Sequence, residues 1–144
     1  MIMEGIKLVI NIEIVDTVIN LARKRRLYER IYTEKNFPDG RIKIGDWGKN
    51  SDSDEWKQYK DSEEKLLDYL TSLDFEAIKE LQVLMYIGRD KPYKEISDGM
   101  QRFNEYFSEF NANGWKDQTI EINTLVEKTP LPEYLLEGKK ILGW

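Results

Sequence analysis

The sequence contains neither cysteine nor histidine, and each absence removes a class of functional site. Without cysteine there is no disulfide, no thiolate nucleophile and no cysteine–zinc centre. Without histidine there is no Ser–His–Asp triad, no imidazole general base and no histidine-ligated zinc or iron. Catalysis would have to use carboxylates, Lys, Tyr, Ser or Thr, or a metal held by oxygen ligands. The sequence itself predicts no cofactor.

Long hydrophobic runs and a strong charge of one sign are also missing. No apolar stretch approaches the roughly 18 residues of a membrane span, and the run after Glu4 makes a poor signal peptide. The net charge of -5 is modest and gives no general case for nucleic acid or an anionic membrane surface. With no cysteine and no glycosylation sequon, this favours a soluble cytoplasmic protein without a membrane partner. The 144 residues suit one domain, residues 1–144, with a single core.

The stretch Leu73–Arg89, LDFEAIKELQVLMYIGR, predicts a buried central helix. Asp74 can cap its first turn, and Leu73 can pack on Ile78 across that cap. The second half is apolar on all sides, so other helices must cover it. Gly88 predicts the C-terminal cap, because glycine takes the left-handed conformation without steric cost.

A first helix is predicted from Ile12 to about Glu34, with Asn11 as its N-cap. The alternation before it, Gly5–Ile12, could form a short edge strand, although a lead-in to the helix is favoured. Helical spacing gives one apolar face, which should be buried. This face consists of Ile14, Val18, Leu21, Tyr28 and Tyr32.

The first helix also carries a basic stripe, defined here as Arg23, Arg26 and Arg30, on the side away from the apolar face. One interpretation is a patch that faces the phosphates of nucleic acid or an acidic partner. The other is a solvated charged face beside Glu29 and Glu34. The second interpretation is favoured, because most runs of charge are simply solvated.

Residues 36–59 break the helical pattern and predict a long connector, acidic at Ser51–Glu55. Connectors longer than about 12–15 residues are usually functional or disordered. Trp47 and Trp56 argue against complete disorder, because such large aromatic side chains usually pack on something. The alternation Arg41–Ile44 could form a brief strand.

A weak calcium-loop pattern falls in the same region. Asn50, Asp52, Asp54 and Asp61 occupy its first, third, fifth and twelfth places. The match is poor because Glu55 stands where the loop needs glycine, and the twelfth place lacks the usual bidentate glutamate. A solvated acidic loop is the favoured interpretation.

Further helices are predicted on both sides of the central one. Asp61 and Glu64 form a capping box that predicts the start of a helix. Only a few residues separate this helix from the central one, so the two are predicted to form an αα-hairpin. After Pro92, a helix to about Ala112 carries an aromatic stripe that favours core packing over a ligand pocket. The apolar positions of these two helices are Leu66, Leu67, Leu70 and Leu73, and Ile96, Met100, Phe103, Phe107 and Phe110.

A short helix over residues 118–127 and a last helix complete the chain, the latter with Thr129 as N-cap and Pro130 as its first residue. Gly138 inside the last helix indicates a close helix–helix approach or an early helix end. We therefore expect an all-α orthogonal bundle of about six helices around Phe75–Ile87, with possible minor short strands. The apolar positions of the last two helices are Ile120, Ile122 and Leu125, and Leu131, Tyr134, Leu135, Ile141 and Leu142.

Two stretches, LMYIGRDK at Leu84–Lys91 and TPLPEYLLEGKKILG at Thr129–Gly143, carry a resemblance. They resemble a family of small bacterial proteins known only as a domain of unknown function, of the three-seven-seven-five type. Its members have a buried helix ending in Leu-Gly-Arg and a tail of the form Thr-Pro-Leu, Tyr-Leu, Glu-Gly, Leu-Gly. The first helix would end near an Ala-Arg pair, here Ala22 and Arg23. The connector and the aromatic helix depart from this pattern, and the resemblance implies no activity.

Three functions remain open. A non-enzymatic interaction or regulatory domain is favoured, binding a protein partner or itself through an apolar helix face or the connector with Trp47 and Trp56. Nucleic-acid binding through the basic stripe is the first alternative. The second is a carboxylate- or metal-dependent enzyme, with Asp52, Asp54, Asp61 and Glu64 as its acidic cluster. A binding surface could also form from Arg89, Asp90 and Glu137.

Overall fold

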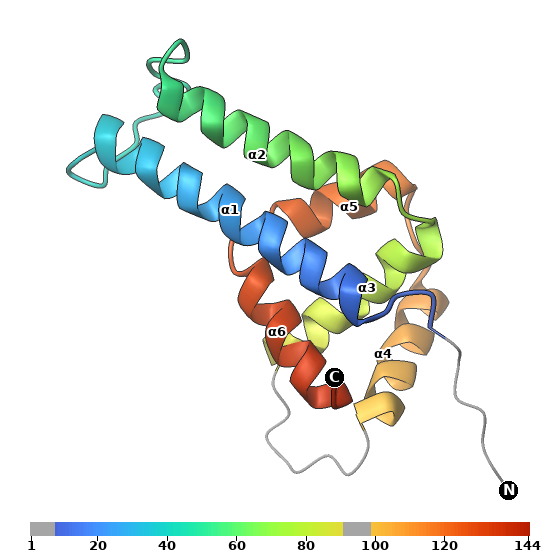
Figure 1. Ribbon diagram of the computed structural model, residues 1–144. Coiled ribbons are helices and arrows are strands. Elements are labelled where there is room, and N and C mark those ends of the chain that lie inside the picture. Colours follow the sequence, from blue (N-terminus) through green and yellow to red (C-terminus); the bar gives the residue numbers. More distant parts are fainter. Residues whose placement is uncertain (1–7, 91–98) are drawn as a thin grey trace, which may run out of the picture.

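The computed structural model describes residues 8–90 and 99–144 and consists of six α-helices (Figure 1). Within these residues there is no β-strand, which confirms the predicted all-α class. The suggested strand at Arg41–Ile44 is wrong, because this part of the chain forms irregular backbone and turns. The alternation Gly5–Ile12 lies partly outside the described residues, and the predicted core position Ile96 lies wholly outside them. The helices are α1 (Ile12–Asn36), α2 (Asp54–Thr71), α3 (Phe75–Asp90), α4 (Gly99–Asn113), α5 (Gln118–Val126) and α6 (Leu131–Leu142).

The helices pack in two main pairs rather than in the order of the chain. α1 and α2 lie antiparallel and side by side, whereas α3 packs against α6 (Figure 1). The predicted hairpin of α2 with α3 is therefore wrong. The tight turn between them instead redirects the chain, so that the apolar face of α2 meets α1 and α5 while α3 contacts α4, α5 and α6. α1 also contacts α6, which joins the two pairs.

α3 is the core of the molecule, as its sequence predicts. Its first turn is closed by the backbone bond from Ile78 N–H to the Asp74 carbonyl, at 3.2 Å. Most side chains from Ala77 to Gly88 are buried. The helix ends at Asp90 rather than at Gly88. Gly88 is therefore not the predicted C-cap. Gly88 lies inside the helix, and a glycine is needed there because a Cβ would overlap the carbonyl oxygen of Tyr134 in α6.

α6 carries the second half of this close contact. A Cβ at Gly138 would lie 2.5 Å from the carbonyl oxygen of Leu84, which confirms the close helix–helix approach predicted there. The helix ends at Leu142, and Gly143 caps it with a left-handed φ of 77°. Its predicted start is wrong, since Pro130 itself takes the N-cap position, with no side-chain capping bond, and Leu131 is the first helical residue.

α2 begins earlier than its capping box predicts. Ser53 is the N-cap, and its hydroxyl accepts a hydrogen bond from the N–H of Trp56 at 3.2 Å. Asp61 lies inside the helix and forms an ion pair with Lys65 at 3.0 Å. A capping pattern inside a continuous helix thus mimicked a helix start, and the true connector is residues 37–53.

α4 and α5 cover the remaining side of α3. In α4 the aromatic stripe packs inward at Phe103, which is fully buried, with Phe107 and Phe110 half-buried beside it. α5 starts at the predicted residue, capped by Asp117, and its apolar residues Ile122 and Leu125 are buried. Ile120 is exposed, whereas Glu121 beside it is buried.

Candidate functional site

The connector, residues 37–53, is held in place by a cluster of five aromatic rings. Tyr32 is fully buried at its centre, and the other four ring centroids lie between 4.9 and 6.4 Å from its own. Edge-to-face and offset contacts in this range are each worth about 0.5–1.5 kcal/mol beyond the buried area. The cluster therefore fixes the connector against the end of α1 and the start of α2. Its other members are Phe37, Trp47, Trp56 and Tyr59.

Hydrogen bonds fix the backbone of the connector as well. The Tyr32 hydroxyl donates to the carbonyl of Lys49 at 2.6 Å. The Asn50 side-chain amide donates to the side-chain oxygen of Asn36 at 2.6 Å, and the Asn36 amide donates to the Tyr32 carbonyl at 2.9 Å. Burial raises the pKa of the Tyr32 hydroxyl above its ordinary value, which already lies well above neutral pH, and the protonated hydroxyl can donate.

The tip of the connector presents apolar side chains to solvent although its base is buried. Ile44 is fully exposed, Ile42 is 46% exposed and Trp47 is 42% exposed. Arg41 and Lys43 alternate with the isoleucines and are exposed too. We call Arg41–Trp47 the connector tip. It combines a Trp held by ring contacts with two isoleucines that contribute little to the core.

The basic stripe of α1 is divided by the fold. The guanidinium of Arg26 forms a two-point ion pair with Glu133 of α6, with distances of 2.5 and 2.6 Å. The hydrogen bond from Arg26 holds the pKa of Glu133 below its usual value. Within the described part of the chain, Arg23 and Arg30 remain exposed and form no ion pair. The stripe thus offers fewer charges to a phosphate backbone than the sequence predicts.

Arg25, which lies outside the stripe, is the arginine that ties the helices together. Its guanidinium donates to Glu63 of α2 at 3.1 Å and to the carbonyl of Val126 in α5 at 3.1 Å. Burial raises the pKa of Glu63, but hydrogen bonds from Lys60, Arg25 and Tyr59 outweigh it and leave that pKa lowered. Nothing in the local sequence separates Arg25 from its neighbours.

The proposed surface of Arg89, Asp90 and Glu137 is only partly assembled. Arg89 bonds Asp90 at 2.8 Å, and the Tyr106 hydroxyl donates to Asp90 at 2.9 Å. These bonds leave the pKa of Asp90 below its usual value, although burial alone would raise it. Glu137 instead pairs with Lys140 at 3.6 Å, and no contact among the described residues joins it to Asp90.

The acidic residues of the calcium-loop pattern and of the enzyme hypothesis do not converge. Within residues 8–90 and 99–144, no group of three or more acidic side chains is placed to hold a metal ion. Asp54 and Asp61 belong to the same helix, α2, and Asp61 pairs with Lys65. The structure therefore gives no geometric support to this cluster as a catalytic centre.

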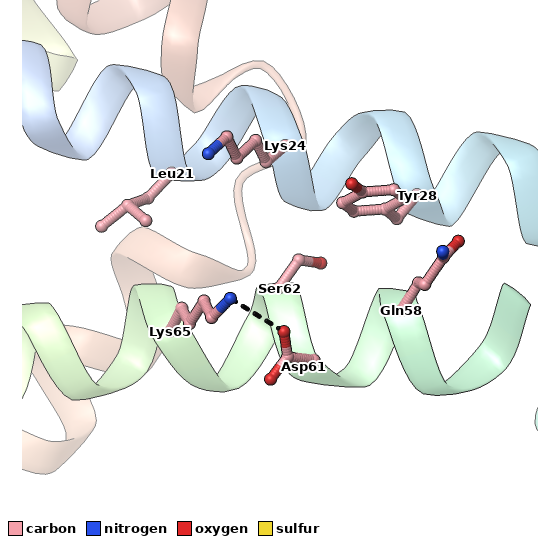
Figure 2. A pocket seen from close by; sticks show the side chains of 7 residues that line it. All are labelled: Leu21, Lys24, Tyr28, Gln58, Asp61, Ser62 and Lys65. Carbon is pink, nitrogen blue, oxygen red and sulfur yellow. Dashed lines mark ion pairs between the residues drawn. The ribbon is translucent and has the colours of Figure 1, made fainter. Parts of the chain in front are cut away.

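Asp61 does line a pocket between α1 and α2, shown in Figure 2. Lys24 and Tyr28 reach it from α1, and Lys65 closes its other side through the ion pair with Asp61. Its volume is about 130 Å³. Sites for small organic ligands measure about 300–1,000 Å³, so this pocket is too small for them.

A buried acid on α3 was missed by sequence reasoning. Glu80 is 3% exposed, and its carboxylate accepts hydrogen bonds from the backbone N–H groups of Val9 and Ile10 at 2.8 and 2.9 Å. These bonds attach the segment before α1 to the core. The available signal was the position of a glutamate in a helix covered on all sides, where any charged group needs a partner.

No family model, curated protein or solved structure matches this chain. The resemblance to the family of unknown function therefore stays a prediction. Across the described ranges, 8–90 and 99–144, none of the helices combines the length and the hydrophobicity that a membrane crossing requires.

Proposed function

We propose that this domain is a non-enzymatic protein-interaction module and that the connector tip is its binding element. The observation that carries the proposal is the contrast within one loop. Its base is fixed by the rings around Tyr32, while Ile42, Ile44 and Trp47 point large apolar surfaces at solvent. Exposed apolar groups gathered on one element are typical of interaction sites.

Rigidity at the base favours binding for an energetic reason. A flexible loop loses conformational entropy when it binds, at about 0.5–1.5 kcal/mol for each side chain that becomes immobile. The hydrogen bond from Tyr32 to Lys49 and the ring contacts of Trp47 hold this loop before any partner arrives. Trp is also a residue type that frequently dominates binding energy in interfaces.

The chemistry of the tip indicates the partner. Ile42 and Ile44 need an apolar groove, and Arg41 and Lys43 between them favour carboxylates along its rim. We therefore propose a protein partner with an acidic-rimmed apolar groove. A cytoplasmic setting and kinship with the bacterial family of unknown function remain parts of this proposal.

The proposal is tested with an Ile42→Ser/Ile44→Ser variant. Because both side chains are exposed, the variant should fold with unchanged stability but lose the partner that the wild type retains from a lysate of the source organism. Ile120→Ser is the matched control, since Ile120 is 43% exposed on α5 and should leave retention unchanged. Equal retention by all three proteins would exclude the connector tip.

Nucleic acid is measured in the same experiment, because Arg23 and Arg30 remain exposed on α1. An Arg23→Ala/Arg30→Ala variant provides the comparison. Binding through these residues would weaken steeply as salt rises and would fall in the variant. That result, with no effect of the isoleucine substitutions, would replace the interaction module with a nucleic-acid-binding domain.

A further inference from the structure

The side of α1 opposite its buried face carries two large apolar side chains. Leu27 is 42% exposed and Ile31 is 38% exposed, and neither is part of the core or packs against it. Because they are four residues apart in one helix, their side chains are neighbours on its surface. We call this surface the α1 outer face and define it as Arg23, Lys24, Leu27, Arg30 and Ile31, all of which are exposed.

Three cations surround the two apolar side chains. At about 100° per residue, Arg23 and Arg30 lie on one side of the pair and Lys24 lies on the other. Within residues 8–90 and 99–144, none of the three forms an ion pair. Arg23 also attracts Glu133 of α6, but that carboxylate is already bonded to Arg26. The outer face therefore presents positive charge that the described part of the chain does not neutralise by direct contact.

The charge of this part of α1 is opposite in sign to that of the whole chain. Residues 20–34 contain five Lys or Arg and two Glu, a balance of +3, whereas the chain carries -5. Of the two acids, Glu29 is paired with Arg25 at 3.8 Å, and Glu34 lies beyond the end of the outer face. A partner that carries carboxylates is therefore favoured at this surface, and a basic partner is repelled.

The two apolar side chains decide which acidic partner fits. The phosphate backbone of nucleic acid offers charge but no apolar side chain that could cover Leu27 and Ile31. A helix whose apolar residues recur at every third and fourth position would cover both. In paired helices, charged residues beside the apolar seam select the partner and its orientation. Arg23, Lys24 and Arg30 occupy such positions beside Leu27 and Ile31.

From the exposed apolar pair and the cations around it, we propose that the α1 outer face binds an acidic amphipathic helix of a partner protein. Leu27 and Ile31 pack against apolar residues of that helix, and the three cations pair with carboxylates on either side of them. Two apolar side chains make a short seam, so the complex is a transient one. This surface goes beyond the connector tip and does not depend on it, because the two share no residue.

The probe is a synthetic helical peptide of about five turns, with leucines at every third and fourth position and glutamates beside them. One control peptide has lysine in place of each glutamate, and a second has the same residues in an order without an apolar face. Binding is followed by methyl NMR at Leu27 and Ile31, with Ile44 of the connector tip observed in the same spectra. The acidic peptide should shift the Leu27 and Ile31 signals in a saturable manner, and neither control should. No saturable shift, or shifts confined to Ile44, would overturn the proposal.

Leu27→Gln/Ile31→Gln removes the apolar pair. Both positions are exposed and glutamine is a good helix former, so the variant should fold. Its affinity for the acidic peptide, measured by fluorescence anisotropy of the labelled peptide, should fall about tenfold or more. The connector-tip variant Ile42→Ser/Ile44→Ser should bind the peptide as the wild type does. Unchanged affinity in Leu27→Gln/Ile31→Gln would refute the site and leave the connector tip untouched.

Arg23→Gln/Arg30→Gln tests the cations. It should weaken binding of the acidic peptide and make the remaining affinity less sensitive to salt. Lys57→Gln/Lys116→Gln removes two exposed cations outside the outer face and is the matched control, which should leave the affinity unchanged. Equal losses in the two variants would show a general attraction of acidic chains and would overturn a defined site.

Two other occupants are outcomes of the same measurements. A DNA duplex that displaces the acidic peptide, and that binds Leu27→Gln/Ile31→Gln as tightly as the wild type, would assign the face to nucleic acid. A dimer in analytical ultracentrifugation that the same variant abolishes would assign the face to a second copy of this chain. Either result would replace the acidic helix as the occupant.

Discussion

Gly88 of α3 and the carbonyl oxygen of Tyr134 in α6 lie so close together that no Cβ fits between them. One turn away on α3, Leu84 presents its carbonyl oxygen to Gly138 of α6 in the reciprocal contact. Each helix therefore uses a glycine to admit the backbone of the other. This pair of contacts sets the separation of the two helices that form the centre of the fold.

Gly88→Ala should destabilise the protein strongly. The added methyl group collides with backbone rather than with a movable side chain, so α3 and α6 must separate, at a cost of about 3 kcal/mol. Gly114→Ala is the control, because nothing lies within 4 Å of its Cβ position and only its φ of 84° resists substitution. That control should cost about 1 kcal/mol. Urea unfolding of both variants measures the difference, and equal losses would contradict the close contact.

Tyr32→Phe should loosen the connector while leaving the bundle folded. The change keeps the ring contacts but removes the hydroxyl that donates to Lys49, with a loss of about 1 kcal/mol. Amide hydrogen exchange should accelerate at residues 47–50 and remain unchanged in α3. Uniformly faster exchange throughout the chain would show instead that the hydroxyl supports global stability.

Glu80→Gln should change how stability depends on pH. Burial raises the pKa of Glu80 in the folded state, although the bonds from Ile10 and Val9 lower it. A raised folded-state pKa stabilises the protein below the unfolded pKa, near about 4.3, and this contribution is lost as pH rises through the folded value. Gln cannot ionise, so the variant should gain stability relative to wild type as the pH rises above the unfolded-state pKa of about 4.3.

Urea unfolding at several pH values measures this gain. Glu34→Gln, a change at an exposed carboxylate on α1, is the control and should show no such relative gain. Parallel pH curves for wild type and Glu80→Gln would contradict the role of burial at Glu80.

Arg25→Ala should destabilise the protein more than Arg23→Ala, although both arginines lie on α1. Arg25 bonds Glu63 and the Val126 carbonyl, so its loss should cost about 2 kcal/mol. Arg23 is exposed, so Arg23→Ala should lower the free energy of unfolding by less than about 0.5 kcal/mol. Thermal or urea unfolding provides the comparison. Similar losses would mean that the contacts of Arg25 contribute little in solution.

Much of the helical content could be predicted because it depends on local patterns. Asn11 is the N-cap of α1, and the apolar second half of α3 is buried on all sides, as expected. The failures concern choices that local patterns leave open. Gly88 suits either a helix end or a close crossing, and only the position of Tyr134 decides between them.

The sites were harder to predict than the helices. α5 is short, and its few apolar residues fit more than one rotation about the helix axis. The sequence marks Ile120, Ile122 and Leu125 as its apolar positions, whereas the packing of α5 buries Glu121 together with Ile122 and Leu125 and leaves Ile120 exposed. Similarly, Trp47 and Trp56 indicated packing, but not that Tyr32 would be their common partner.

The pairing of α3 with α6 also has a consequence for synthesis of the chain. While the ribosome is still translating α4 and α5, the face of α3 with Leu84 and Gly88 has no helix to cover it. The core can close only after Leu131–Leu142 has left the exit tunnel. Until then the nascent chain exposes apolar surface, the condition in which chaperones bind and aggregation begins.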